Sequence, residues 1–363
     1  MRRLRILTII AVVLAIVVFL IKNRKPSTLV AGNGLLVDKV WMVTNPHPLI
    51  AQKDVRPPDQ TFLTYPEWFL VFSPVEQADY FQTHTSTTFP YLKHVDQMWK
   101  GYDVMYNQVK GNYPFNTGYH VMIVVIAGST TVEYGIKSFY ETIIGRVTDT
   151  KAAITDEDKF NADYERSYIK FIEDLPWYEY DFNHQLKALW TNTSLTGPDM
   201  LRKWERKYYL TTELMVKSGY GWLIKLATKS AYETALLNTS VVTDKLPADM
   251  HNYPEISNIK YLPDAKVMMD LPRYARFKQS VSKLAEDGVN FKEIAGNTGA
   301  ILLTVITNEN SINETNSKQL FCQPIFTKPG LNRIALVTTV LRLNDVVRQL
   351  IKNKVVIEHM YDF

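Results

Sequence analysis

The sequence predicts an α+β protein with an N-terminal transmembrane helix, a mainly helical middle domain over residues 60–245 and a C-terminal ferredoxin-like α/β sandwich over residues 255–363. Three observations predict this arrangement. A long apolar run lies near the N-terminus, helical spacing dominates the middle of the chain, and short alternating segments follow Pro247. A proline-rich linker over residues 26–59 is expected to join the anchor, residues 1–25, to the folded body.

The apolar run from Ile6 to Ile21 is the evidence for the anchor. Thr8 is its only polar residue, and Arg or Lys residues flank the run on both sides. A helix of this length spans about 24 Å, slightly less than a hydrocarbon core of about 30 Å, and the flanking cations can reach the headgroups. A cleaved signal peptide is the competing interpretation, but the basic residues after the run leave no small-residue cleavage site there. We therefore expect a single-pass signal-anchor protein that contacts the lipid bilayer through Ile6–Ile21.

Charge and composition exclude several classes of protein. The formal net charge of +4 comes largely from the residues that flank the anchor, so the rest of the chain has no excess of basic residues that would indicate nucleic-acid binding. The single cysteine, Cys322, excludes an intramolecular disulfide and a multi-cysteine metal site. The seven histidines lack zinc-ligand spacing, and no phosphate-binding glycine loop is present, so we expect neither metal nor cofactor. Long domains translocate largely regardless of charge, which favours a bacterial envelope protein with most of its chain on the exported, periplasmic side.

Helical spacing defines the middle domain. Ser73-Pro74-Val75-Glu76 resembles a helix start, because Ser73 can cap, Pro74 suits the first position and Glu76 can complete a capping box. Further helices are expected over residues 92–110, 118–148, from Thr155 onward, and over 199–237.

The predicted helix over residues 118–148 contains a second apolar stretch, Val121–Ala127. Seven apolar residues are too few to span a membrane, and a longer window includes Glu133 and Lys137, which are costly at the centre of a bilayer. We interpret this segment as a buried core helix, with a second membrane span as the alternative.

The C-terminal part alternates between strands and helices. Helices are expected over residues 273–286 and 344–352, and strands over residues 266–270, 291–295, 301–307, 321–327, 334–343 and 355–360. A turn at Gly296-Asn297 is expected to join the second and third of these strands as a hairpin. The order β-α-β-β-β-β-α-β is a ferredoxin-like plan enlarged by a hairpin, with its helices on one face.

Two segments of the sequence share one spacing of Glu, Lys and Tyr, and this repeat, which we call the internal echo, supplies the candidate site. The segment from Glu133 through Lys137 to Tyr140 has the same spacing as the one from Glu213 through Lys217 to Tyr220. Residues at i, i+4 and i+7 share one helix face, so each Glu can pair with its Lys. The echo indicates two solvated salt-bridged faces, a buried polar site in which the pairs meet across a helix hairpin, or coincidence. A competing register matches residues 137–142 with 229–234.

Several phrases together resemble a family of uncharacterised bacterial membrane-anchored proteins: Leu63-Thr-Tyr-Pro-Glu-Trp68, Pro176-Trp177-Tyr178, Leu271-Pro-Arg-Tyr274, Ile294-Ala-Gly-Asn297 with Ile301-Leu-Leu-Thr304, and Ile357-Glu-His-Met-Tyr361. The resemblance runs from about residue 60 to residue 363. It implies that anchor, helical middle and C-terminal sheet belong together, and it implies no reaction and no catalytic residue. Phe69 departs from the pattern, since similar sequences carry a more polar residue there, which weakens the case for a polar site at Glu67-Trp68.

Two functional classes follow. The first is an envelope-side binding or scaffold module, with a possible protein partner at the membrane, because no catalytic constellation is visible and the ferredoxin-like plan serves many roles. The alternative is a membrane-associated enzyme with an acid–base or hydrolytic site. Its candidate residues are Glu133, Lys137 and Tyr140 with Glu213, Lys217 and Tyr220.

Overall fold

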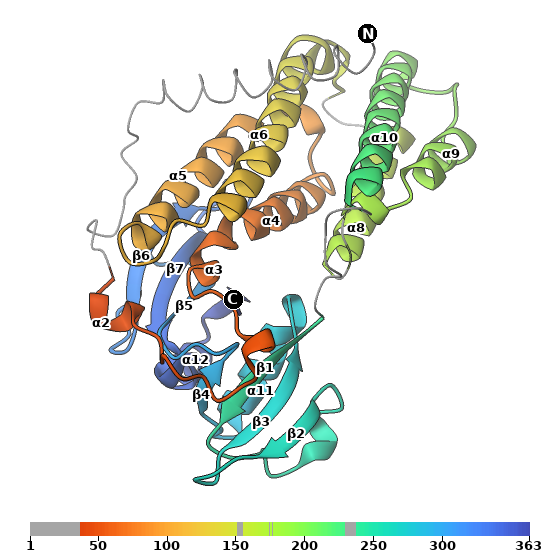
Figure 1. The fold of residues 1–363 in the computed structure, drawn as a ribbon. Coiled ribbons are helices and arrows are strands. Elements are labelled where there is room, and N and C mark those ends of the chain that lie inside the picture. The colour runs from red at the N-terminus through yellow and green to blue at the C-terminus, as the bar shows by residue number, and fades with distance from the viewer. Residues whose placement is uncertain (1–36, 151–154, 174, 176, 229–236) are drawn as a thin grey trace.

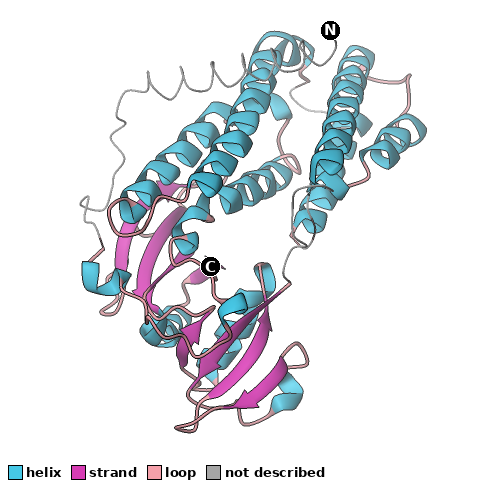
Figure 2. Cartoon of the chain, in the orientation of Figure 1, coloured by secondary structure: helices cyan, strands magenta, loops and turns pink. Residues whose placement is uncertain are grey.

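The computed structural model of the chain describes residues 37–150, 155–173, 175, 177–228 and 237–363. Within them the protein is α+β, with a helical middle followed by antiparallel sheets, as expected. In Figure 2 the long helices lie at the top of the view, and the sheets lie in its centre and lower part together with further helices. The predicted anchor, Ile6–Ile21, lies outside the described residues.

The helical part begins with short helices and continues with long ones (Figure 1). Its elements are α2 (Lys39–Met42), η1 (Gln52–Asp54), α3 (Gln60–Leu63), α4 (Tyr65–Tyr80), η2 (Ser86–Thr88), α5 (Tyr91–Val109), α6 (Thr117–Tyr140), η3 (Glu141–Gly145), α7 (Arg146–Thr148), α8 (Asp156–Ile172), η4 (Trp177–Glu179), α9 (Phe182–Asn192) and α10 (Met200–Thr228). The predicted helices over 92–110 and 118–148 and the one from Thr155 are confirmed. A capping box at Thr155 and Asp158 starts α8.

The helix start predicted at Ser73 is wrong. Helix α4 begins eight residues earlier, at Tyr65, with Pro66 near its first position, and runs through Pro74. Ser73 does not cap; its hydroxyl lies 2.8 Å from His94 Nδ1 and 2.9 Å from Tyr134 Oη. The aromatic residues before Ser73 supply enough burial to extend the helix through the proline, because Phe62, Leu63, Tyr65 and Phe69 form part of one core.

The stretch Thr117–Thr148, formed by α6, the π-helical turn η3 and α7, is long and apolar enough to cross a membrane. It is the one helical stretch with this property in the described part of the chain. Only 28% of the most apolar 18-residue segment of this stretch is buried. The interpretation as a buried core helix therefore holds for one face of α6, and the other face is exposed.

The strands form two four-stranded antiparallel sheets, β2-β3-β1-β4 and β6-β7-β5-β8. Their bounds and those of the associated helices are β1 (Asn238–Thr243), η5 (Met250–Asn252), β2 (Ser257–Tyr261), β3 (Val267–Pro272), α11 (Ala275–Glu286), β4 (Phe291–Ile294), β5 (Ala300–Thr307), β6 (Lys318–Pro324), β7 (Asn332–Thr339), η6 (Val340–Arg342), α12 (Leu343–Lys352) and β8 (Val356–Met360). Each sheet carries one long helix, inserted between its third and fourth strands.

The two sheets are copies of one plan. Each runs strand, strand, strand, helix, strand, and places these in the spatial order second, third, first, fourth. The pairing of the first strand with the fourth also shifts register at the same step, Val242/Thr243 in β1 and Thr304/Val305 in β5, because the fourth strand has one extra residue there, Lys292 in β4 and Glu358 in β8. The part from β1 to β8 is therefore an internal structural repeat.

Backbone hydrogen bonds at the helix ends repeat as well. Val289 N donates to Leu284 O over 2.9 Å after α11, and Val355 N donates to Leu350 O over 2.9 Å after α12. Gly288 and Lys354 hold the matching position in each turn with φ of 69° and 57°. A left-handed residue is a common helix stop, and Gly adopts it without strain whereas Lys does not.

Two findings correct the predicted sandwich. Strands β1 and β2 were not predicted, and the eight strands divide between two sheets, so the single enlarged ferredoxin-like sheet is wrong. The turn at Gly296-Asn297 links β4 to β5, which belong to different sheets, and does not form a hairpin. The sheet part starts at Asn238, earlier than the predicted residue 255, because β1 lies in the middle of its sheet between β3 and β4.

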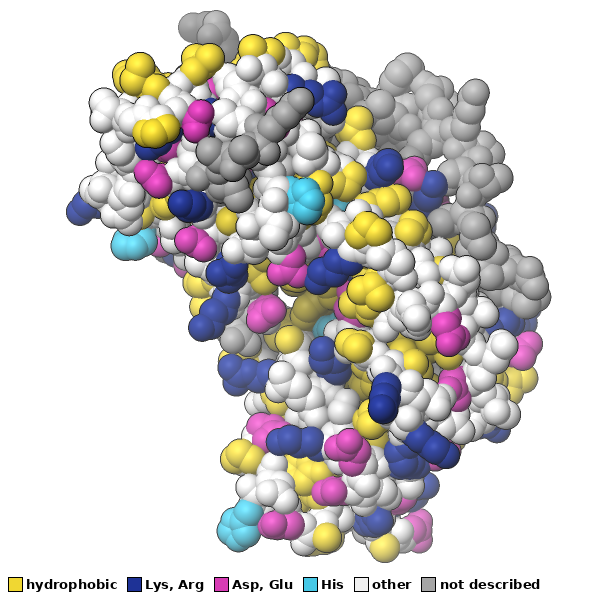
Figure 3. All heavy atoms as spheres, turned by 180° about the vertical axis from the view of Figure 1, so that it is seen from behind, with side chains coloured by type: hydrophobic (Ala, Val, Ile, Leu, Met, Phe, Trp, Pro, Cys, Tyr) yellow, Lys and Arg dark blue, Asp and Glu magenta, His cyan; other side chains and the backbone are white. Residues whose placement is uncertain are grey.

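Two large hydrophobic cores, with smaller clusters among the helices, hold the described part of the molecule together. One lies between the sheets and helices α11 and α12 and is built from both repeats, including Val281, Leu284, Val347 and Leu350. The other joins α3, α4, α5 and α6 to residues of β5, β6 and β7. Helices and sheets therefore share a core. From behind, a recess between them shows hydrophobic side chains at its floor and charged side chains around it (Figure 3).

The described part of the predicted linker, residues 37–59, is not free. The backbone N–H groups of Leu49 and Ile50 donate to the buried Glu293 carboxylate on β4, and Arg56 N donates to Ala295 O over 2.9 Å. These bonds fasten the segment to the junction of the two sheets. Gly299 lets it pass closely, because a Cβ there would lie 2.9 Å from Trp41 O.

Candidate functional site

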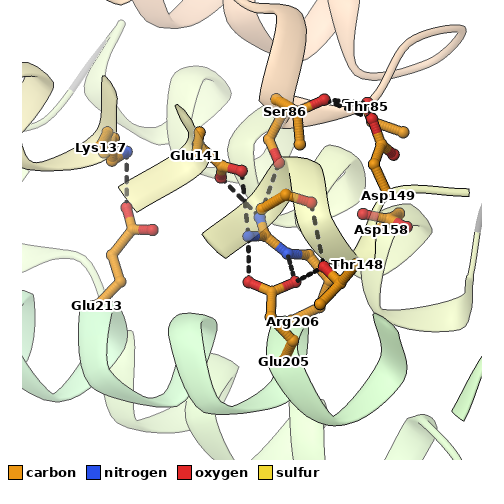
Figure 4. Close-up of polar contacts among 12 residues, drawn as sticks. Thr85, Ser86, Lys137, Glu141, Thr148, Asp149, Asp158, Glu205, Arg206 and Glu213 are labelled. Atoms are coloured by element: carbon orange, nitrogen blue, oxygen red, sulfur yellow. Dashed lines mark hydrogen bonds and ion pairs between the residues drawn. The ribbon is translucent and has the colours of Figure 1, made fainter. Parts of the chain in front are cut away.

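The two halves of the sequence echo meet in the structure. Helices α6 and α10 run antiparallel, and Lys137 Nζ lies 3.1 Å from Glu133 Oε1 on its own helix and 2.8 Å from Glu213 Oε1 across the gap. Lys217 repeats the pattern, 2.9 Å from Glu213 and 3.5 Å from Glu133. Each lysine thus lies between the same two carboxylates, and the Lys137–Glu213 bridge is drawn in Figure 4. The residues of the competing register, 229–234, lie outside the described residues.

Burial and charge hold the four groups in their ionised forms. Burial acts to raise the pKa of Glu213, but the Lys137 and Lys217 ammonium groups outweigh it and lower that pKa to about 2. The pKa of Glu133 is also lowered against the effect of burial, by Lys217 and then Lys137. Both lysine pKa values are raised despite burial, chiefly by Glu213.

Sequence reasoning missed a third carboxylate. Glu165 on α8 lies 3.9 Å from Lys137 and accepts a 2.8 Å hydrogen bond from Gln77 Nε2 on α4. Burial raises the pKa of Glu165, and the two lysines only partly oppose that effect. A signal was present: Asp158, Ala162, Glu165 and Ile169 follow a 4-3-4 spacing, which places Glu165 on the buried face of α8.

The two tyrosines of the echo do not join the ion cluster. Tyr140 packs against Tyr209, with ring centroids 4.8 Å apart, and its pKa is raised by burial and by a hydrogen bond to Glu205. Tyr220 is 38% exposed and stacks on Trp177. The predicted site residues thus divide into a four-charge cluster and two separate tyrosines.

The ion cluster forms one end of a groove of about 590 Å³. Helices α4 and α6 provide most of its walls, and α5, α8, η4 and α10 contribute at the sides. Along α6 the lining runs from Met122 to Lys137, a length of about 22 Å. The walls are mainly apolar, and they include Leu70, Val95, Met98, Met122, Ile126, Ile172 and Trp177.

The other end of the groove also has a carboxylate, that of Glu67. It lies ten residues before Gln77 on α4, a distance of about 15 Å along the helix. Burial raises the pKa of Glu67 to about 7, and a side-chain hydrogen bond with Tyr119 only partly opposes this shift. The neighbouring Trp68 faces elsewhere and stacks on His359, with centroids 3.6 Å apart. Phe69, which argued against a polar site, lies in the core and also lines the groove together with Glu67.

A second buried network adjoins the ion cluster along α6 and α10 (Figure 4). The Arg206 guanidinium contacts Glu205 and donates to Glu141 Oε1 over 2.7 Å and to Ser86 Oγ over 2.7 Å. Arg202 pairs with Asp158 over 2.8 Å. These bonds join α10 to η3, η2 and α8, and they hold α10 in place beside the neighbouring ion cluster. They line no part of the groove.

No set of three or more His, Cys, Asp or Glu side chains that could hold a metal ion occurs within the described ranges. No protein-family profile, curated protein or solved structure matches this chain. The resemblance to membrane-anchored bacterial proteins accordingly stays an expectation.

Proposed function

We propose that this chain is a single-pass membrane-anchored binding protein whose helical part holds an amphipathic ligand in the groove along α6. The observation that carries the proposal is the groove itself, apolar along its length and closed at one end by buried charges. Small-molecule sites are typically concave and mostly apolar, with a few fixed polar groups that orient the ligand. The anchor predicted at Ile6–Ile21 keeps this site beside the membrane, with the bulk of the chain on the exported side.

The charge of the cluster favours a particular kind of ligand head. Lys137 and Lys217 are outnumbered by Glu133, Glu165 and Glu213, so the fully ionised cluster carries one surplus negative charge. A buried carboxylate without a full counter-charge is unfavourable. An ammonium group or strong hydrogen-bond donor at this end would compensate Glu165. A carboxylate head would add a second surplus charge, so we expect cationic amphiphiles to bind in preference to fatty acids.

The enzyme alternative gains little from this geometry. A general acid or base has to change its protonation state near the working pH. The pKa shifts keep Glu133 and Glu213 ionised and both lysines protonated at neutral pH. Tyr140 lies outside the cluster. These residues therefore suit a fixed polar end of a binding site better than proton transfer.

A photoreactive alkylamine with a diazirine on its chain tests the proposal. The full chain in phospholipid vesicles is irradiated with the probe, and labelled residues are mapped by peptide mass spectrometry. We expect labels on the groove residues Met98 and Met122. Ile126→Trp, which fills the groove, should reduce this labelling several-fold. Val125→Trp is the matched control, because the adjacent side chain lies on the outer face of α6 and is 44% exposed.

The head preference is tested with the corresponding alkylcarboxylate. We expect weaker labelling by that probe, and a loss of the difference in Glu165→Gln. Equal labelling of Met98 and Met122 in Ile126→Trp and Val125→Trp would show that the groove is not the binding site. Stronger labelling by the carboxylate would keep the groove but reverse the assignment of the ligand class.

A further inference from the structure

The outer face of α6 and α7 carries a long apolar stripe that is interrupted only at Ser129. Its members are exposed by between 37% and 77% and recur every three to seven residues: Val121, Val125, Val132, Ile136, Phe139, Ile143 and Val147. This is helical spacing on one face, over about 40 Å. Exposed apolar surfaces of this extent usually mark an interaction site.

Charge is absent from this face. The charged residues between Thr117 and Gly145 are Glu133, Lys137 and Glu141, and all three contact α10. The nearest exposed basic residues along the chain lie at the ends of the stripe: Lys110 before α6 begins, and Arg146 beside Val147 in the last turn. An uncharged apolar face with basic residues at its ends has the composition of an interfacial helix that lies in the plane of a membrane.

The predicted anchor brings this face to a bilayer. Residues 22–36 separate the apolar run from the described chain, and fifteen residues reach at most about 50 Å. The described chain enters beside the start of α6: Val37 N donates to Gln108 Oε1 over 3.0 Å, and Tyr113 Oη donates to Met42 O over 3.1 Å. The tether therefore begins next to the end of the stripe.

A transmembrane orientation does not fit the packing around α6. Helix α5 packs along it and exposes Lys93 and Asp103. If α6 crossed the bilayer within this fold, these neighbouring charges would enter the hydrocarbon, each at a cost of several kcal/mol, about 3 at the centre. Lying parallel to the surface, α6 places its stripe in lipid and leaves α5 in water.

We propose that α6 and α7 rest lengthwise on the lipid surface, with the stripe from Val121 to Val147 immersed at the level of the headgroups and upper acyl chains. The groove lining on the same helix, from Met122 to Lys137, lies on the adjacent face. The rim of the groove would then lie beside the bilayer. This contact does not depend on the ligand proposed above.

Fluorescence quenching tests the proposal on the full chain. In a Cys322→Ser background, single cysteines are introduced by Ile136→Cys or Phe139→Cys and labelled with an environment-sensitive nitrobenzoxadiazole. Matched controls are Leu92→Cys on α5 and Tyr261→Cys on β2, exposed by 58% and 77%. Each protein is reconstituted into phosphatidylcholine–phosphatidylglycerol vesicles with and without doxyl-labelled lipid. We expect several-fold stronger quenching at both stripe positions than at both controls.

Each other outcome overturns the proposal. Quenching at Ile136 and Phe139 no greater than at Leu92 would place the stripe away from lipid. Lipid-independent self-quenching, with disulfide crosslinks between stripe cysteines, would identify a second copy as the partner. A blue-shifted label that no lipid quencher reaches would indicate cover by another segment of this chain. Near-ultraviolet circular dichroism of each labelled variant confirms that it is folded.

Discussion

Several buried cations in this protein contact two carboxylates from different elements. Lys137 joins Glu133 to Glu213 across α6 and α10, and Arg333 on β7 joins Glu76 of α4, at 2.9 Å, to Glu358 of β8, at 2.6 Å. Removing one partner of such a pair is strongly destabilising, whereas the intact pair adds little over an apolar substitute. The ion clusters therefore fix positions more than they add stability.

Glu213→Ala is expected to reduce the free energy of unfolding by about 3–5 kcal/mol, because it leaves two buried ammonium groups with less compensation. Glu179→Ala is the control. Its pair with Lys225 is exposed on both sides, 39% and 44%, and should contribute less than about 1 kcal/mol. Urea unfolding of the two variants measures both values. A loss for Glu213→Ala as small as that for Glu179→Ala would contradict a buried cluster.

Acid should weaken the protein through the same residue. The pKa of Glu213 falls from an ordinary 4.5 to about 2 in the folded state, so its contribution is complete above pH 4.5 and is lost as the pH falls toward 2. Glu165, whose pKa is raised, acts in the opposite direction, because it adds stability as the pH falls toward 4.5 and changes little below that value. Urea midpoints measured between these pH values should fall less steeply in Glu213→Gln than in the unaltered chain. Parallel curves would assign the acid sensitivity to other carboxylates.

At the scale of elements, glycine positions decide how closely helices approach. A Cβ at Gly101 on α5 would overlap the ring of Tyr65, which is fully buried and packs against Phe69, Phe321 and Tyr361. At Gly135 on α6 nothing lies within 4 Å of an added Cβ. The same substitution therefore meets opposite surroundings in two helix interiors.

Gly101→Ala is expected to destabilise the protein and Gly135→Ala is not. Alanine gains about 1 kcal/mol in helix propensity over glycine at either site. At Gly101 the added methyl group overpacks the core at a cost of about 1–3 kcal/mol, which outweighs that gain, because the Tyr65 ring is packed on all sides and cannot move aside. At Gly135 the gain stands alone. Thermal unfolding of both variants checks the prediction, and a higher midpoint for Gly101→Ala would refute the tight approach of α5.

Element types were predictable from local pattern where burial follows a clear period. Helix α11 has Phe277, Val281 and Leu284 at helical spacing, and its bounds were predicted closely. Strand β2 was missed because all of its residues are exposed, so it has no buried face to reveal. Helix α4 was mistaken at its start because the local cap signal at Ser73 was outweighed by aromatic burial that depends on the tertiary fold.

The candidate site was half predictable for a related reason. The i, i+4 echo placed Glu133 with Lys137 and Glu213 with Lys217, and the structure brings the pairs together. The echo does not indicate which further helices complete the cluster, so Glu165 on α8 and Gln77 on α4 were missed. The repeat of the two sheets was also hidden, since its equivalences lie in backbone bonds and φ angles, as at Gly288 and Lys354, and hardly in residue identities.

At the scale of the whole molecule, the helical part and the second sheet are not independent. Helices α3, α4 and α5 cover one face of that sheet, where the buried side chains are Leu302, Leu320, Phe321, Ala335, Val337 and Tyr361. Thr61 on α3 adds polar ties, since its hydroxyl donates to Tyr361 O over 2.8 Å and accepts from Leu302 N over 2.9 Å. The chain thus has one connected interior, although the spacing of its apolar residues changes from helical to alternating near Pro247.

A fragment containing residues 237–363 alone is therefore expected not to form a stable monomer. Burying the five larger of these six side chains contributes roughly 8–15 kcal/mol at about 1.5–3 kcal/mol each, comparable with a total stability of about 5–15 kcal/mol. Without the helices this face is exposed, so the fragment should bind the dye anilinonaphthalene sulfonate and aggregate. The full chain in detergent is the reference. A monomeric fragment with a cooperative unfolding transition would show that the repeat folds alone, and that the helices only dock onto it.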